Sequence, residues 1–271
     1  MVRYDKILRK SAAQADRFAE LSAKYETLQA DYAKIKRALD STLHEVRRFS
    51  GELSSYSEHL NKQLEAQHVD AATRELCETI FYTSGMISSR LAFTDLELNP
   101  AAVRLQVPLR AGIYKKFEKA GHVLSLKARL RHVAIQMKGS SFMEIEALPS
   151  FELLPFVLLD NAIKYSPSYQ PITVRFDESA HGTQLEVCIT STGPYLDPNE
   201  RSIVLERGKR GRNAEKSPIT GDGLGLYLAQ FLCGYHDLRL RIASDQSGIY
   251  DIDGIPYAPF IVRLNAELTS S

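Results

Sequence analysis

The sequence predicts an α+β protein. An N-terminal coiled coil and helical hairpin would form a dimeric four-helix bundle, and an α/β sandwich with a mixed sheet would follow. Three observations predict this: a heptad seam runs through the first sixty residues, a break near residue 70 precedes a second helical segment, and helix and strand periodicities alternate after residue 100. We place the domain boundary between residues 97 and 98, which gives predicted domains 1–97 and 98–271.

The heptad seam belongs to one long predicted helix. From Ser11 to about Gln67 there is no Pro and one Gly, and apolar residues recur in alternating steps of three and four, with Thr42 filling the gap. A lone helix would leave this stripe in water, so the seam requires a dimer or an intramolecular bundle. The seam residues are Phe18, Leu21, Tyr25, Leu28, Tyr32, Ile35, Leu39, Val46, Phe49, Leu53, Tyr56 and Leu60.

A second helix is predicted after the break at residues 68–71. Asp70 can cap a helix that runs from about Ala72 to Phe93. Two antiparallel helices in each chain, doubled by dimerisation, make a four-helix bundle.

Residues after Pro100 alternate between helical and extended patterns. Helices are expected at 107–119, 151–165 and 227–235, and strands at 172–176, 185–189, 238–242 and 260–264. We expect an irregular connection from Ser247 to Pro259. A mixed, largely antiparallel sheet with helices on one face fits this order.

Composition limits the classes of function. An apolar content of 44% with 25% charged residues is typical of a soluble globular protein. Lys and Arg total 34 against 33 for Asp and Glu, so the charge predicts neither nucleic acid nor an anionic membrane as a partner. The N-terminus carries no apolar stretch like that of a signal peptide, so a cytoplasmic location is expected. The three cysteines are far apart and predict neither a disulfide framework nor a zinc site.

Two motifs point to a nucleotide. Residues 160–167 read Asp-Asn-Ala-Ile-Lys-Tyr-Ser-Pro, and residues 221–226 read Gly-Asp-Gly-Leu-Gly-Leu. An Asn and a Lys one helical turn apart can hold Mg²⁺ and the phosphates that it bridges, while a Gly-x-Gly-x-Gly turn lets backbone N–H groups approach phosphate oxygens as a helix begins. Together the two motifs predict ATP.

These motifs carry a family resemblance. Residues 152–167 resemble the N box of the histidine kinases of two-component signalling, and residues 221–226 resemble their second glycine box. Residues 191–196 lie where that family has its first glycine box, and residues 205–211 where it has the segment leading into a mobile ATP lid. The resemblance covers about residues 100–265, and less specifically residues 40–97.

The resemblance implies a set of nucleotide contacts with ATP and Mg²⁺ as cofactors. Asn161 would coordinate Mg²⁺, Lys164 would neutralise phosphate charge and Tyr165 would pack beside the nucleotide. The remaining implied contacts are Ser191 and Gly193 near adenine, Lys209 and Arg210 in the lid, and Gly221, Gly223, Leu224, Gly225 and Leu226 around the phosphates.

His44 is the predicted phosphoacceptor. Counted from Phe18, it falls at the sixth heptad position and therefore faces solvent. The sequence from His44 to Arg47 resembles the family's H box, in which the His attacks the γ-phosphate and the next acidic residue, here Glu45, accepts its proton. The family's usual Pro five residues after the His is replaced by Phe49, and His59 is the next candidate. A hinge near residues 97–100 would let the ATP domain reach His44.

Two positions depart from the family pattern. Val157, four residues before Asn161, replaces the usual Asn of the kinases or Glu of the hydrolysing relatives, so ATP hydrolysis is not expected and Mg²⁺ affinity would fall. Ser191 replaces the Asp that reads the adenine amino group, and Tyr195 replaces a Gly. A hydroxyl can still hydrogen-bond adenine, but a neutral acceptor is weaker than a carboxylate.

The prediction for function is a cytoplasmic, homodimeric histidine kinase. It would autophosphorylate on His44 from Mg·ATP and pass the phosphoryl group to an Asp on a response-regulator receiver domain. Only about 40 residues precede His44, so the input would come through the coiled coil or a bound partner, or the chain is a piece of a larger one. Two alternatives stay open: a non-catalytic dimeric adaptor or phosphotransfer protein, and an ATP-driven conformational switch.

Overall fold

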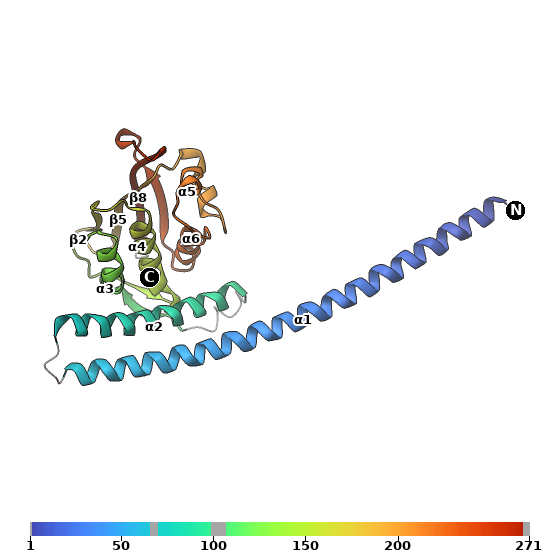
Figure 1. Ribbon diagram of the computed structural model, residues 1–271, viewed down its shortest axis with the longest axis horizontal. Coiled ribbons are helices and arrows are strands. Elements are labelled where there is room, and N and C mark those ends of the chain that lie inside the picture. Colours follow the sequence, from blue (N-terminus) through green and yellow to red (C-terminus); the bar gives the residue numbers. More distant parts are fainter. Residues whose placement is uncertain (1, 66–69, 99–106, 268–271) are drawn as a thin grey trace. The chain divides into compact units, whose positions relative to one another are not determined.

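A computed structural model describes residues 2–65, 70–98 and 107–267 (Figure 1). It divides into two compact units, residues 1–52 and 53–271. The predicted domain boundary at 97/98 remains a prediction, because it borders residues 99–106, which lie outside the described ones. The predicted hinge at residues 97–100 also remains a prediction, because residues 99 and 100 lie outside the described ones. Among the described residues, no helix combines the length and apolarity needed to cross a membrane.

The first unit consists of one continuous helix, α1 (Val2–Glu65), which runs on into the second unit. The described residues leave its heptad seam uncovered: the twelve seam side chains are between 37% and 75% exposed. Thr42, the polar residue of the seam, turns its hydroxyl back to donate to the Ala38 carbonyl oxygen at 2.9 Å. Such a bond satisfies the hydroxyl within the helix itself.

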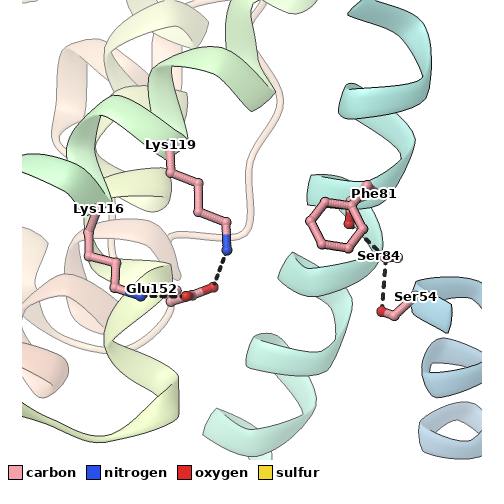
Figure 2. Close-up of polar contacts among 6 residues, drawn as sticks. All are labelled: Ser54, Phe81, Ser84, Lys116, Lys119 and Glu152. Atoms are coloured by element: carbon pink, nitrogen blue, oxygen red, sulfur yellow. Dashed lines mark hydrogen bonds and ion pairs between the residues drawn. The ribbon is translucent and has the colours of Figure 1, made fainter. Parts of the chain in front are cut away.

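The end of α1 and α2 (Ala71–Leu98) form a helical hairpin, as predicted. Asp70 caps α2: its carboxylate accepts from the Thr73 hydroxyl at 2.6 Å and from the Thr73 backbone N–H at 2.9 Å, and these bonds lower the pKa of the carboxyl. Figure 2 shows the contact between the two helices: the Ser84 hydroxyl donates to the Phe81 carbonyl at 2.7 Å and lies 2.9 Å from the Ser54 hydroxyl. Because Ser84 has one proton, Ser54 is the donor in this pair.

The second unit also contains a mixed sheet covered by a layer of helices, which confirms the predicted α+β class. Within the described residues its strand order is β2-β4-β5-β8-β6, with β7 paired to β8. Among these described strands β2 and β4 run parallel, and the other pairs are antiparallel. The strands are β2 (Ile135–Lys138), β4 (Ile172–Glu178), β5 (Gln184–Pro194), β6 (Arg239–Ser244), β7 (Tyr250–Ile252) and β8 (Ile255–Glu267).

The core lies between the sheet and three helices, α3 (Ile113–Leu130), α4 (Leu153–Tyr165) and α6 (Gly225–Tyr235). Helix α4 packs between α3 and α6 (Figure 1). Its sequence is apolar on nearly all sides, as expected for a helix with neighbours on several faces, and Leu154, Leu159 and Ile163 are fully buried. The central position of α4 fixes the direction of its C-terminal polar residues.

The start of α4 is held by a charge cluster (Figure 2). Glu152, the last residue of the 3-10 helix η2 (Pro149–Glu152), accepts from Lys116 at 2.6 Å and Lys119 at 3.0 Å. Burial alone would raise the pKa of Glu152, but the two lysines outweigh it and hold this pKa below its usual value. The cluster therefore ties α3 to the turn that leads into α4.

The sequence-based elements need three corrections. Residues 109–112 form strand β1 (Leu109–Gly112) instead of the start of a helix, because they pair with β3 (Glu144–Ala147) in a small antiparallel sheet. Helix α3 therefore begins later and extends eleven residues beyond Lys119, ending at Leu130. The connection from 247 to 259 is ordered as η5 (Gln246–Gly248), β7 and the first part of β8.

Candidate functional site

The site is a cavity of about 600 Å³ in the second unit. It lies between the end of α4, the C-terminal end of β5, the segment 204–214 and the turn that opens α6. The twelve residues predicted to contact a nucleotide all line it: Asn161, Lys164, Tyr165, Ser191, Gly193, Lys209, Arg210, Gly221, Gly223, Leu224, Gly225 and Leu226. Residues up to 65 positions apart in sequence are thus brought to one place.

The glycine turn approaches its neighbours more closely than any side chain would allow. Gly223 has φ +65°, and a Cβ there would lie 2.5 Å from the Gly208 carbonyl carbon and 2.7 Å from Lys209 backbone atoms. Its carbonyl accepts from the Gly208 N–H at 3.1 Å. Gly223 therefore joins the start of α6 to the segment that carries Lys209 and Arg210.

The first turn of α6 faces the cavity through its backbone. Leu224 occupies the N-cap position without a side-chain hydrogen bond to the helix, and residues 223–226 line the cavity. Free N–H groups and the positive end of the helix dipole favour an anion at such a place.

Two cations converge beside this turn. The Lys164 Nζ lies 5.5 Å from the Tyr165 ring centroid, and the Arg210 Cζ lies 6.0 Å from the same centroid. The Lys164 Nζ also lies against Gly221, whose missing side chain leaves it room. Burial lowers the pKa of Lys164, and the charge of Arg210 lowers it further. The pair forms a positively charged side of the cavity.

The lid segment is ordered around Arg210. Its Nη2 donates to the Ile219 carbonyl at 2.7 Å and to the Ala214 carbonyl, while the buried Nε has no hydrogen-bond partner among the described residues. The short helix α5 (Arg212–Lys216) is fixed by the buried Glu200, which accepts from the Arg212 backbone N–H and Nε, both at 3.0 Å. Burial would raise the pKa of Glu200, but these bonds lower it.

Comparison with known proteins identifies the domain around this cavity. Residues 153–254 match the family "Histidine kinase-, DNA gyrase B-, and HSP90-like ATPase". The sensor histidine kinase Hik2 of Thermosynechococcus vestitus is 31% identical over 224 residues, which are 79% of this chain and 56% of Hik2. The chain is a relative of the sensor histidine kinases.

A second relative aligns with a shorter part of the chain. The histidine protein kinase SaeS of Staphylococcus aureus is 26% identical over 121 residues, 43% of this chain and 34% of SaeS. The chain therefore spans between about a third and about half of the length of these curated relatives. A solved structure of the mycobacterial sensor histidine kinase MprB covers 59% of this chain and 97% of its own with a TM-score of 0.47 and 21% identity.

The two catalytic residues predicted for this histidine-kinase relative lie in the first unit. His44 and Glu45 are both exposed on α1, and for His44 this agrees with its heptad position. The alternative, His59, is exposed too, but its Nε2 lies 3.0 Å from the Gln63 side-chain nitrogen.

The predicted Mg²⁺ ligand stands nearly alone. The Asn161 Oδ1 and a Val157 methyl both lie close to Gly225. A Cβ built on Gly225 would be 3.8 Å from the Asn161 Oδ1 and 3.6 Å from the Val157 methyl. The neighbouring Asp160 is engaged in an ion pair with Lys127, and the exposed Asp222 lines the cavity near Lys164. Mg²⁺ prefers oxygen ligands in octahedral geometry, so one amide oxygen beside a methyl group fits it poorly.

The structure adds lining residues that the sequence motifs did not indicate. Phe260 of β8 pairs with Ser191 of β5 and places an aromatic ring in the cavity wall. Helix α2 also contributes Thr83, Met86, Ile87, Arg90 and Leu91. Helix α2 packs on η2 and α3, and Glu75 accepts from Arg129 at 2.7 Å and Ser125 at 3.1 Å. No local pattern marks these residues, because their role depends on which elements pack together.

Proposed function

We propose that this chain is an ATP-dependent protein-histidine kinase that works as a homodimer. The observation that carries the proposal is the gathering of all twelve predicted nucleotide contacts around one cavity in a histidine-kinase-type ATPase domain. The cavity is large enough for a nucleotide and combines an apolar wall with a positively charged side.

The proposed phosphoacceptor is His44. Its imidazole nitrogen would attack the γ-phosphorus of ATP, the bond to the bridging β,γ-oxygen would break, and ADP would leave with that oxygen. Glu45 would accept the proton that the ring loses. The phosphoryl group would then pass to an Asp of a response-regulator receiver domain, as the kinship to sensor histidine kinases suggests.

Dimerisation is proposed from two uncovered apolar stripes. The seam of α1 is exposed along its length, and α2 presents Leu76 and Ile80, which are 52% and 41% exposed and lie one helical turn apart. Burying each large apolar side chain contributes about 1.5–3 kcal/mol, so association of two such hairpins is strongly favoured. The seam before His44 is also the proposed place for an input signal or partner.

Labelling with γ-³²P ATP tests the kinase. We expect a base-stable, acid-labile label that His44→Gln removes and His59→Gln retains. Glu45→Ala should slow labelling and leave nucleotide affinity unchanged, since a proton acceptor acts in the transition state. Labelling that survives His44→Gln would overturn the assignment of His44.

A second candidate is an adaptor or an ATP-driven switch without phosphoryl transfer. The replacements at Val157 and Ser191 favour it, because they remove a polar ligand and a carboxylate from the cavity wall. This candidate predicts ATP binding without labelling of any histidine. Protection of residues 204–220 from protease by ATP would then separate a switch from an adaptor.

A further inference from the structure

We propose that this cavity binds its nucleotide as the metal-free polyphosphate anion, with Lys164 and Arg210 supplying the positive charge that a divalent cation would otherwise provide. The inference rests on the proposed nucleotide binding and names the ionic form of the ligand. The charged residues that line the cavity, and the ion pairs and hydrogen bonds that each of them forms, support it.

The oxygen donors are few. Beside Asn161 the wall presents a Val157 methyl, and Asp160 is paired with Lys127. Asp222 is the remaining carboxylate among the described lining residues, and it is exposed at the turn between two glycines. A hydrated Mg²⁺ would gain little from such a wall, because most of its coordination would have to come from water and the phosphates themselves.

The cations outnumber the carboxylates. Lys164, Lys209 and Arg210 line the part of the cavity near the glycine turn, where Asp222 is the one unpaired carboxylate among the described residues. Neither Lys164 nor Arg210 forms an ion pair with a described residue, and Arg210 is held only by the carbonyl oxygens of Ala214 and Ile219. The low pKa of Lys164 reflects burial next to another positive charge.

Without an anion, the positive charges in this part of the cavity repel one another. Two cations near one aromatic ring repel each other, and the uncapped start of α6 adds a further positive end. A polyphosphate brings several negative charges to this point. It would relieve the repulsion, form charge-assisted hydrogen bonds with both side chains and accept from the free N–H groups of the glycine turn.

Calorimetry with the full chain tests the inference. We expect ATP to bind in excess EDTA with a dissociation constant within about threefold of that in Mg²⁺. Lys164→Met and Arg210→Met should each weaken binding in EDTA about tenfold or more, since each removes a charged partner. Arg210→Lys keeps the charge but loses the two carbonyl bonds, so it separates a charge effect from a change in the lid.

Val157→Asn is the converse variant. It is close in size to Val and restores an amide oxygen one turn before Asn161, so Mg²⁺ should now tighten ATP binding by about tenfold. If this variant melts like the wild type and stays indifferent to Mg²⁺, then Val157 is not the cause of metal independence and that part of the inference is overturned.

The outcomes distinguish this inference from the proposed function. Wild-type binding that requires Mg²⁺ would overturn the metal-free form and leave the kinase proposal standing. Absence of ATP binding in both solutions would overturn both. A loss of affinity as large in Arg210→Lys as in Arg210→Met would show that Arg210 acts by shaping the lid and not by its charge.

Discussion

The two units of this chain become stable in opposite ways. The first, residues 1–52, belongs to a single helix whose large apolar side chains stay exposed, while the sheet and helices of the second enclose a core with Phe117, Leu154 and Ile189 almost fully buried. The ATPase domain can therefore fold by contacts within one chain, whereas α1 needs another surface to cover its seam. Burial of the α1 seam therefore depends on assembly, whereas the core of the second unit is buried by the chain itself.

The largest expected effect is on assembly. Replacing Leu28 and Ile35 with Lys places charges in the middle of the seam, and we expect monomers by light scattering while the ATPase domain keeps its melting transition. Ala30→Lys, on the opposite side of the helix, should leave the dimer intact. Wild-type chain that is monomeric at micromolar concentration would contradict the dimer proposal.

Within the ATPase domain the largest effect is on the core. Phe117 is fully buried against Phe176, with ring centroids 5.7 Å apart, so Phe117→Ala should lower the free energy of unfolding by about 3–5 kcal/mol. Phe142→Ala is a matched control, because that ring is 92% exposed and its loss should change stability by less than about 0.5 kcal/mol. Denaturant titration followed by tyrosine fluorescence measures both. Equal effects would mean that Phe117 is not a core residue.

Gly223→Ala tests the join between the glycine turn and the lid. The added methyl would collide with the backbone of Gly208 and Lys209, so we expect ATP affinity to fall about tenfold or more, or ~1.4 kcal/mol. Gly254→Ala has a similar positive φ but open space around it and lies away from the cavity. It should lose some stability and no affinity. Comparable losses of affinity in both variants would contradict the role of close approach.

The smallest effect concerns pH. His236 is buried. Its Nδ1 donates to the Leu232 carbonyl at 2.7 Å and its Nε2 accepts from the Leu148 N–H at 3.1 Å, so both ring nitrogens are hydrogen-bonded in the neutral form. Burial lowers the pKa of His236. As pH falls below the ordinary pKa of 6.5, His236 becomes protonated in the unfolded chain while it stays neutral in the native protein.

Stability should therefore be full above the ordinary pKa and should decline as pH drops below it, by at most about 1.4 kcal/mol for each pH unit. The decline should level off below the lowered native pKa. Denaturant titrations at several pH values would show it, and His236→Gln should remove it while the exposed His181→Gln should not. An unfolding free energy that stays constant across this range would contradict the proposed bonding of the neutral ring.

The sequence alone determined the features that depend on local spacing. The heptad steps predicted α1, Asp70 predicted the start of α2, and the apolar run before Asn161 predicted α4. The cavity-lining residues of the motifs at 160–167 and 221–226 were also predicted from sequence, because each motif brings its own backbone geometry, whereas Ser191, Gly193, Lys209 and Arg210 were implied by the family resemblance. A helix turn or a tight glycine turn is specified by residues that lie within a few positions of one another.

Only the tertiary structure decided what depends on distant partners. Residues 109–112 have a helical pattern but form a strand, because Leu109 and Ala111 pair with residues 147 and 145. The order of strands, the contribution of α2 and Phe260 to the cavity, and the approach of Arg210 to Tyr165 likewise join residues far apart in sequence. Local periodicity contains no information about such pairings, since their free energy comes from packing and hydrogen bonds that form only once the chain has folded.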